Sequence, residues 1–389
     1  MVDASERLQP SPWVDWCAGR IGDPVVRLRF LRAVAPELGQ VPVKPRPAPR
    51  RYLALALSLI PIPLLLVLFL ARGRTQAADA PIRPAVSAAL PAPAESGPPP
   101  DVWQVEKSAN SETYSNGLRV DNRLAVTHHV RGYRLFPADP EDRGGGVAGS
   151  QPMGIVFHTT ESRQAPFEAQ QNGELQRLGE SLLEYVQRKR AYNFLIDRFG
   201  RVYRIVVESD AADHAGYSVW SDGKWLYVNL NESFLGISFE AETHPGQVEA
   251  RVSPAQLRAA AMLTEMLRGR YGIAGTNCVT HAQVSVNPSN MRIGYHTDWA
   301  SSFPFEALGL PDNYGQPPPA LWAAGFEADP VFLRTAGPRL GASVRLAENR
   351  LAESARAGGI SLRSYRERLR KQYRERLAEL RGSMTADSE

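Results

Sequence analysis

The chain has 389 residues, 43% hydrophobic and 22% charged, and is long enough to bury a sizeable core in about two domains without disulfide bonds. Its two cysteines, Cys17 and Cys278, exclude a disulfide scaffold and a multi-cysteine zinc or iron–sulfur protein. The net charge of +4 comes from the two ends of the chain. Residues 1–51 carry nine basic and five acidic side chains, and residues 331–389 carry thirteen basic and seven acidic ones. The basic excess therefore lies outside the middle of the chain, and nothing predicts a nucleic-acid partner.

Residues 52–71 form an uncharged apolar run that is long enough to cross a bilayer as a helix. Arg50 and Arg51 precede this run and Arg72 and Arg74 follow it, which favours a transmembrane helix over a buried core helix. The run lies too far from the start of the chain and is too long for a cleaved signal peptide. Nine Lys/Arg before it, against three between it and residue 100, predict a cytoplasmic N-terminus. We therefore expect a single-pass protein of the inner (cytoplasmic) membrane, with its C-terminal part exported to the periplasm or the cell exterior.

The segments on either side of this run differ in composition. Residues 1–51 form a cytoplasmic tail, in which residues 24–38 alternate basic and apolar side chains. This pattern fits an amphipathic helix for a partner or the membrane surface, and it fits a solvated tail equally well. Residues 72–101 are rich in Ala and Pro, which predicts a semi-extended linker.

An α/β pattern begins after residue 101. Residues 102–149 alternate as strands do, with a turn at Asn116-Gly117, and predict a β-rich N-terminal extension of the domain that follows. Residues 150–330 alternate between strand and helix patterns and form the main domain. Its expected elements are a strand at 154–160, a helix at 174–190, a hairpin over 191–206, a strand at 234–242 and a helix at 254–273.

Residues 331–389 are predicted to be an Arg-rich helical C-terminal extension. The run 361–382 contains Arg–Glu pairs at helical spacing, as any solvated helix can. Packing on the main domain, contact with the membrane and binding of an unknown partner all remain open for this helix.

Three polar residues stand out in the main domain. His158 ends an apolar strand in GIVFHTT, His281 follows the second helix in NCVTHAQVS, and Asp298 comes seventeen residues later in RIGYHTDWASSFPF. Two imidazoles and one carboxylate with a fourth position open are a catalytic zinc set, and zinc there would polarise a carbonyl and activate water. The spacing alone does not identify this site, because each residue taken singly is more often structural.

Six pieces of sequence in a fixed order add weight to this set: VFHTT, AYNFLIDRFGRVYR, DHAGYS, LGISFEAE, THAQVSVNP and HTDWASSFPFEAL. Over residues 150 to about 310 they resemble the zinc-dependent N-acetylmuramoyl-L-alanine amidases of the type 2 family, whose fold is shared by peptidoglycan recognition proteins and phage lysozyme-amidases. The resemblance implies an α/β fold with a central mixed β-sheet flanked by helices. It also implies a Zn²⁺ ion held by His158, His281 and Asp298.

The resemblance assigns further roles around the metal. Tyr192 matches a tyrosine that assists the catalytic water in phage and animal relatives. His296 stands where relatives often carry Lys, and it either stabilises the oxyanion or supports or replaces a metal ligand. His214 matches a residue along the substrate groove, while Thr159 and Thr160 either orient the first ligand or line the cleft.

One position departs from the family pattern. Ser238 stands in LGISF where anhydromuropeptide amidases carry a catalytic Glu, and Glu240 lies two residues further on the same strand face. Either Tyr192 does the acid–base work, which we favour, or Glu240 has been recruited for it.

The resemblance implies a membrane-anchored enzyme that hydrolyses the amide between N-acetylmuramic acid and L-alanine in peptidoglycan or a muropeptide. The alternative is a non-catalytic peptidoglycan-binding protein of the same fold. Relatives of that kind typically lack a zinc ligand, and this chain has all three, which favours the enzyme.

Overall fold

The computed structural model describes residues 101–386 apart from positions 143, 145 and 244–251. The expected tail, transmembrane helix and linker at residues 1–100 lie outside the described residues. Among the described helices, none combines the length and the apolar character that a bilayer span requires.

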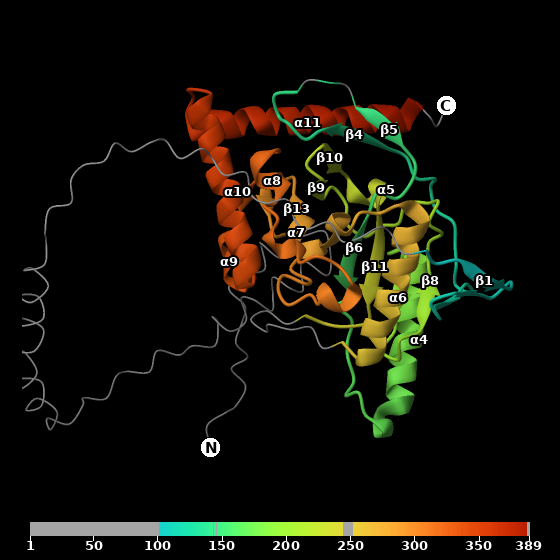
Figure 1. Ribbon diagram of the computed structural model, residues 1–389. Helices are drawn as coiled ribbons and strands as arrows, with labels where there is room; N and C mark the ends of the chain where they lie inside the picture. Colours follow the sequence, from blue (N-terminus) through green and yellow to red (C-terminus); the bar gives the residue numbers. More distant parts are fainter. Residues whose placement is uncertain (1–100, 143, 145, 244–251, 387–389) are drawn as a thin grey trace, which may run out of the picture. The chain divides into compact units, whose positions relative to one another are not determined.

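The centre of the described part is a mixed eight-stranded β-sheet (Figure 1). Across the sheet its strands are β1 (Gln104–Lys107), β2 (Ser111–Tyr114), β3 (Arg119–Asp121), β8 (Val202–Arg204), β7 (Phe194–Ile196), β11 (Phe234–Phe239), β6 (Gly154–Thr159) and β12 (Cys278–Thr280). Strands β7, β11, β6 and β12 run parallel to one another, whereas β7 pairs with β8 in the antiparallel sense. Every residue of β6 and β11 is buried, as expected for central parallel strands.

Helices α4 (Asn172–Lys189) and α6 (Pro254–Tyr271) cover opposite faces of this sheet. On strand β7, Phe194 belongs to the same apolar cluster as Leu263 of α6, whereas Leu195 packs with Val186 of α4. Successive side chains of a strand point to opposite faces, so the sheet lies between the two helices. The predicted central mixed sheet flanked by helices is confirmed.

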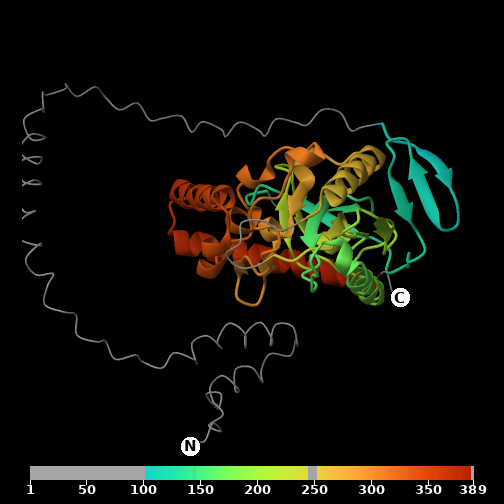
Figure 2. The same cartoon turned by 90° about the horizontal axis from the view of Figure 1, so that it is seen from below.

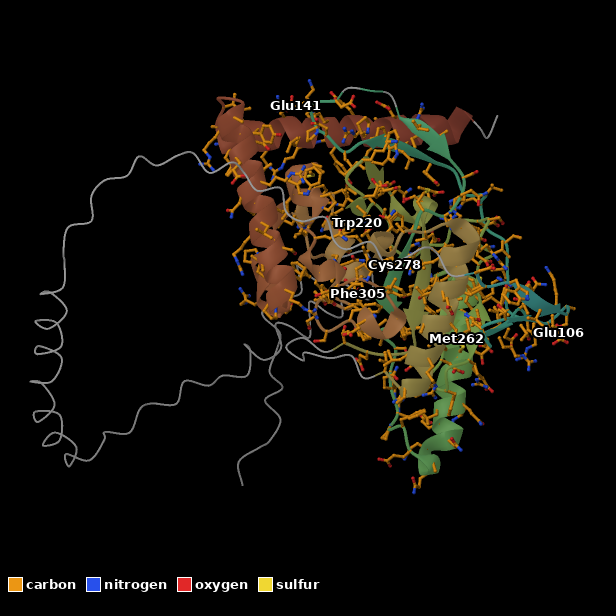
Figure 3. The ribbon with its side chains drawn as sticks, viewed as in Figure 1. Glu106, Glu141, Trp220, Met262, Cys278 and Phe305 are labelled. Atoms are coloured by element: carbon orange, nitrogen blue, oxygen red, sulfur yellow. The ribbon has the colours of Figure 1, made fainter. Side chains whose placement is uncertain are left out.

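The N-terminal extension continues the main sheet, because β3 pairs with β8 and β1–β3 follow at its edge (Figure 2). The predicted turn at Asn116-Gly117 is present, with Gly117 at a φ of +86°. The Asn116 side chain donates to the Met262 carbonyl at 2.9 Å, which ties this turn to α6. Glu106 of β1 lies far from the body of the molecule, whereas Trp220 and Cys278 lie inside it (Figure 3).

A second sheet, a small three-stranded sheet of β13, β14 and β15, and the C-terminal helices complete the body. The second sheet has the order β5 (Val147–Gly149), β4 (Tyr133–Pro137), β10 (Trp225–Val228) and β9 (Val219–Ser221). Apart from short 3-10 helices, the remaining described elements are α5 (Leu230–Ser233), α7 (His281–Val284), β13 (Val286–Asn287), β14 (Arg292–Ile293), α8 (Pro319–Trp322), β15 (Glu327–Ala328), α9 (Pro330–Thr335), α10 (Pro338–Ala357) and α11 (Leu362–Ala386).

The long helix α11 lies along β4 and β5 (Figure 1). Gln372 donates to the Pro140 carbonyl at 3.2 Å, and Tyr373 is almost fully buried. The Arg368 guanidinium pairs with Glu141, which Figure 3 shows beside this helix. Of the three roles left open for the C-terminal extension, the structure therefore shows packing on the folded body, here against the N-terminal extension.

Candidate metal centre

The three expected metal ligands meet at the carboxyl ends of two neighbouring parallel strands. His158 is the fifth residue of β6, and His281 directly follows β12, which pairs with β6. Asp298 comes from the loop after β14, and its carbonyl accepts a hydrogen bond from the Ala282 N–H at 3.2 Å. Residues distant in sequence therefore meet at the carboxyl ends of the parallel strands, where ligand sites of such sheets form.

The side-chain distances fit a single metal ion. His281 Nδ1 lies 3.0 and 3.2 Å from the two Asp298 oxygens, and His158 Nδ1 lies 3.3 Å from one of them. One ligand atom from each residue lies within 4.8 Å of the others, and all three side chains are buried. Zinc bonds of about 2.0–2.1 Å in tetrahedral geometry separate ligand atoms by about 3.4 Å. This donor set therefore suits zinc.

Hydrogen bonds behind His158 determine which ring nitrogen carries its proton. His214 Nε2 lies 3.2 Å from the Phe234 carbonyl oxygen, so in the neutral ring Nε2 donates and Nδ1 accepts. His158 Nε2 lies 3.1 Å from that Nδ1 and therefore donates to it. Burial, together with the neighbouring His281, lowers the pKa of His158 to about 4, so its Nδ1 holds a lone pair at neutral pH. A lone pair that faces a carboxylate fits a cation between them.

Arg131, from the segment between β3 and β4, holds the same carbonyl. Its Nη1 donates to the Phe234 and Glu232 carbonyls at 3.0 and 2.7 Å, and its Nη2 donates to the Asp210 carbonyl at 2.9 Å. The side chain is almost fully buried. A guanidinium of the N-terminal extension thus fixes the acceptor that orients His214. Nothing in the sequence signals this role.

Tyr192 lies beside the metal ligands, with its ring centroid 5.1 Å from that of His158. Its φ of +66° is uncommon for a residue other than glycine and turns the chain into β7. Burial and the negative charge of Asp298 raise the pKa of its hydroxyl above the usual value. The hydroxyl therefore remains protonated at neutral pH and can donate a hydrogen bond to a developing negative charge.

His296 packs flat against the first residue of α7. Its ring centroid lies 4.5 Å from that of His281 with an interplanar angle of 21°. The backbone N–H of His296 donates to Ser285 Oγ at 2.9 Å, which fixes the loop before Asp298. The structure thus brings His296 to the site, but the metal-ligand set found among the described residues does not include it.

The two threonines after His158 form local hydrogen bonds. Thr160 Oγ1 donates to the Ala241 carbonyl at 3.3 Å, which joins the end of β6 to the segment after β11. Thr159 Oγ1 donates to the Glu161 carboxylate at 2.5 Å. Neither hydrogen bond reaches His158, so orienting the first ligand and contacting a substrate both remain predictions for these threonines, as substrate contact does for His214.

Glu161 is a residue of this site that the sequence reasoning missed. Its carboxylate also accepts hydrogen bonds from the Thr243 N–H at 3.1 Å and the Thr243 hydroxyl at 2.5 Å. Burial and, to a smaller extent, the negative charge of Asp298 raise its pKa. The signal in the sequence that could have identified Glu161 is a carboxylate three residues after an expected metal ligand.

Glu240 lies at the end of β11, but its carboxylate interacts with a neighbouring turn. It accepts a hydrogen bond from the Arg198 N–H at 3.1 Å, and burial raises its pKa. Ser238 pairs in register with His158 and so lies closer to the metal ligands along the strand. Among the contacts of the described residues, none joins Glu240 to a metal ligand, so its recruitment for acid–base work remains an untested prediction.

Two buried imidazoles, a carboxylate and a tyrosine hydroxyl meet at one end of the sheet, and this set of groups is typical of metal-dependent hydrolases. Residues 148–298 match the model of the family N-acetylmuramoyl-L-alanine amidase (Amidase_2). This match supports an N-acetylmuramoyl-L-alanine amidase activity for this part of the chain. A search of the curated proteins finds no match.

Several solved structures are similar to this chain. N-acetylmuramoyl-L-alanine amidase LysC from Clostridium intestinale URNW is 20% identical over 47% of this chain and 93% of its own, with a TM-score of 0.26. AmiD from E. coli, solved with the substrate anhydro-N-acetylmuramic acid-L-Ala-D-gamma-Glu-L-Lys, is 24% identical over 34% of this chain and 49% of its own, with a TM-score of 0.27. The Drosophila peptidoglycan recognition protein SD is 17% identical over 42% of this chain and 85% of its own, with a TM-score of 0.26.

Proposed function

We propose that this chain is a zinc-dependent enzyme that hydrolyses the amide bond between N-acetylmuramic acid and L-alanine in peptidoglycan or muropeptides. The observation that carries the proposal is the convergence of His158 Nδ1, His281 Nδ1 and the Asp298 carboxylate, with the His158 proton directed away towards His214. The family of residues 148–298 supplies the reaction.

Zinc bound by these three residues would polarise the scissile carbonyl and lower the pKa of a water molecule towards neutrality. The Tyr192 hydroxyl, kept protonated by its raised pKa, donates to the oxygen on which negative charge develops. His296 adds a second donor from the side of His281. Glu161 accepts hydrogen bonds from Thr159 and Thr243 and so holds the segment that follows His158.

Peptide release from purified cell walls and from a soluble muramyl peptide tests this function directly. The wild-type chain should hold one zinc ion and release peptide, whereas Asp298→Ala and His281→Ala should lose both. Asp101→Ala, which removes an exposed carboxylate, is the matched control. A wild-type chain that holds stoichiometric zinc but releases no peptide would contradict the enzyme and support a binding protein.

We further propose that residues 52–71 anchor the enzyme in the cytoplasmic membrane, with the N-terminus inside and the amidase domain exported. The uncharged run and the excess of Lys/Arg before it support this topology. Reporter fusions after residues 40 and 110 test it. A cytoplasmic signal from the second fusion would rule out export.

A further inference from the structure

A pocket of about 330 Å³ lies next to the loop that carries Asp298. Tyr295 and Thr297 of this loop line it on one side, and helix α9 lines it on the other. The Tyr295 ring lies 4.6 Å from His296, whose ring stacks on His281 at 4.5 Å. Two successive ring contacts therefore connect Tyr295 in the pocket wall to the expected metal ligand His281. Its α9 wall lies beyond residues 148–298, the segment that matches the family.

The charged groups of this pocket neutralise each other. Arg292 Nη1 lies 3.4 Å from one Asp329 oxygen, and the other Asp329 oxygen accepts hydrogen bonds from the Val331 and Phe332 N–H groups at the start of α9. The carboxylate is therefore already occupied, and no unpaired cation is left among the lining residues that the structure describes. A ligand with free carboxylates, such as a stem peptide, has no charge partner here.

The remaining groups are neutral donors and an aromatic surface. The side-chain oxygens of Asn287 and Asn290 accept from the Ser289 and Arg292 N–H groups, which leaves their NH₂ groups as donors. No acceptor among the described residues takes either NH₂ group. The Tyr295 side chain is 49% exposed. Amide donors beside an open aromatic ring suit a sugar, which stacks an apolar face on the ring and offers hydroxyl and acetamido oxygens to the donors.

We infer that this pocket binds the amino sugar next to the muramoyl unit in the glycan strand. The inference rests on the proposed function and narrows its substrate to one with at least two sugars. The volume lies at the small end of the range for ligand pockets, which suits one sugar residue. Because α9 builds one wall, the C-terminal extension takes part in choosing the substrate.

Kinetics on two substrates test this inference: a disaccharide peptide and the corresponding muramyl peptide with a single sugar. The full-length wild-type chain should have a higher kcat/KM for the disaccharide peptide. In Tyr295→Ala the ratio of the two kcat/KM values should fall at least tenfold, mainly through KM. Trp103→Ala removes an exposed aromatic residue before β1 and should leave the ratio as in the wild type. An equal ratio in wild type and Tyr295→Ala overturns the inference.

Binding of a peptide-free disaccharide, N-acetylglucosaminyl-N-acetylmuramic acid, gives a readout that needs no hydrolysis. NMR saturation transfer should show binding to the wild-type chain and its loss in Tyr295→Ala and Asn290→Ala. Failure of the wild type to cleave either substrate counts against the proposed function, while this measurement still tests the pocket. Binding of a free stem peptide instead, with loss in Tyr295→Ala, would overturn the sugar assignment.

Discussion

His158 Nε2 and His214 Nδ1 lie 3.1 Å apart, so the first metal ligand is held from behind by a second imidazole. That imidazole donates to the Phe234 carbonyl, which also accepts a hydrogen bond from Arg131. In each of these two imidazoles, the hydrogen bonds can all form only when the proton is on Nε2. The lone pair of His158 is directed at the metal position before any metal binds.

Loss of His214 should weaken the metal site more than the fold. We expect His214→Ala to reduce zinc affinity by about 10–100-fold, measured by competition with a chelator, because an outer partner fixes ligand orientation. His214→Gln should restore part of the affinity, since its oxygen can accept from His158 and its NH₂ can donate to Phe234. Equal zinc affinity in wild type and His214→Ala would contradict the role of this hydrogen bond.

Tyr192→Phe should reduce kcat by about 10²–10³-fold with little change in KM or zinc content, because it removes one donor to the developing negative charge. The raised pKa of Tyr192 also predicts that its ionisation causes no loss of activity below about pH 10. Steady-state kinetics across pH 6–10 would check both points. Tyr365→Phe on α11 is the matched control, and a similar kcat in Tyr192→Phe and wild type would exclude the donor role.

A buried ion pair joins the N-terminal extension to the amidase domain. Glu112 of β2 accepts hydrogen bonds from the Tyr114 hydroxyl at 2.6 Å and from Arg204 Nη2 at 3.1 Å. Burial alone would raise the pKa of Glu112, but these two partners outweigh it and lower the pKa to about 2. Since the folded pKa lies below the unfolded value of 4.5, this stabilisation is complete above about pH 4.5 and is lost as the pH falls towards 2.

Glu112→Gln should therefore lower the free energy of unfolding at pH 6 and flatten its decrease between pH 4.5 and 2. Urea unfolding at several pH values would measure this. Glu106→Gln, on the exposed strand β1, should behave like the wild type. An unchanged slope in Glu112→Gln would show that this carboxylate is not stabilised by Arg204 in the folded chain.

Packing of α11 should contribute to the stability of the whole described body. Leu369 of α11 is fully buried, and its replacement by Ala should cost about 2–5 kcal/mol in the free energy of unfolding. Leu362→Ala, at a position that is 41% exposed, should cost less than about 0.5 kcal/mol. A separate early melting step in Leu369→Ala, with the main transition unchanged, would contradict cooperative folding of this extension.

Local sequence signals predicted most of the elements. Ser253 accepts from the Gln256 N–H at the start of α6 as its residue type suggests, and Gly200 turns the predicted hairpin with a φ of +82°. The metal ligands could be assigned because the order of six short motifs resembles a family. Pairing between distant segments could not be predicted, since neither the burial of Arg131 nor the α9 wall of the pocket follows from local periodicity.

The strand order has a consequence for cutting the chain at its family boundaries. Strand β3 pairs with the outer side of β8, and β3 lies before residue 148, where the family match begins. A fragment of residues 148–298 would leave β8 as an uncovered edge and would remove α11 from the second sheet. Unpaired edge strands recruit other chains, so the excised fragment should self-associate where the longer chain stays dispersed.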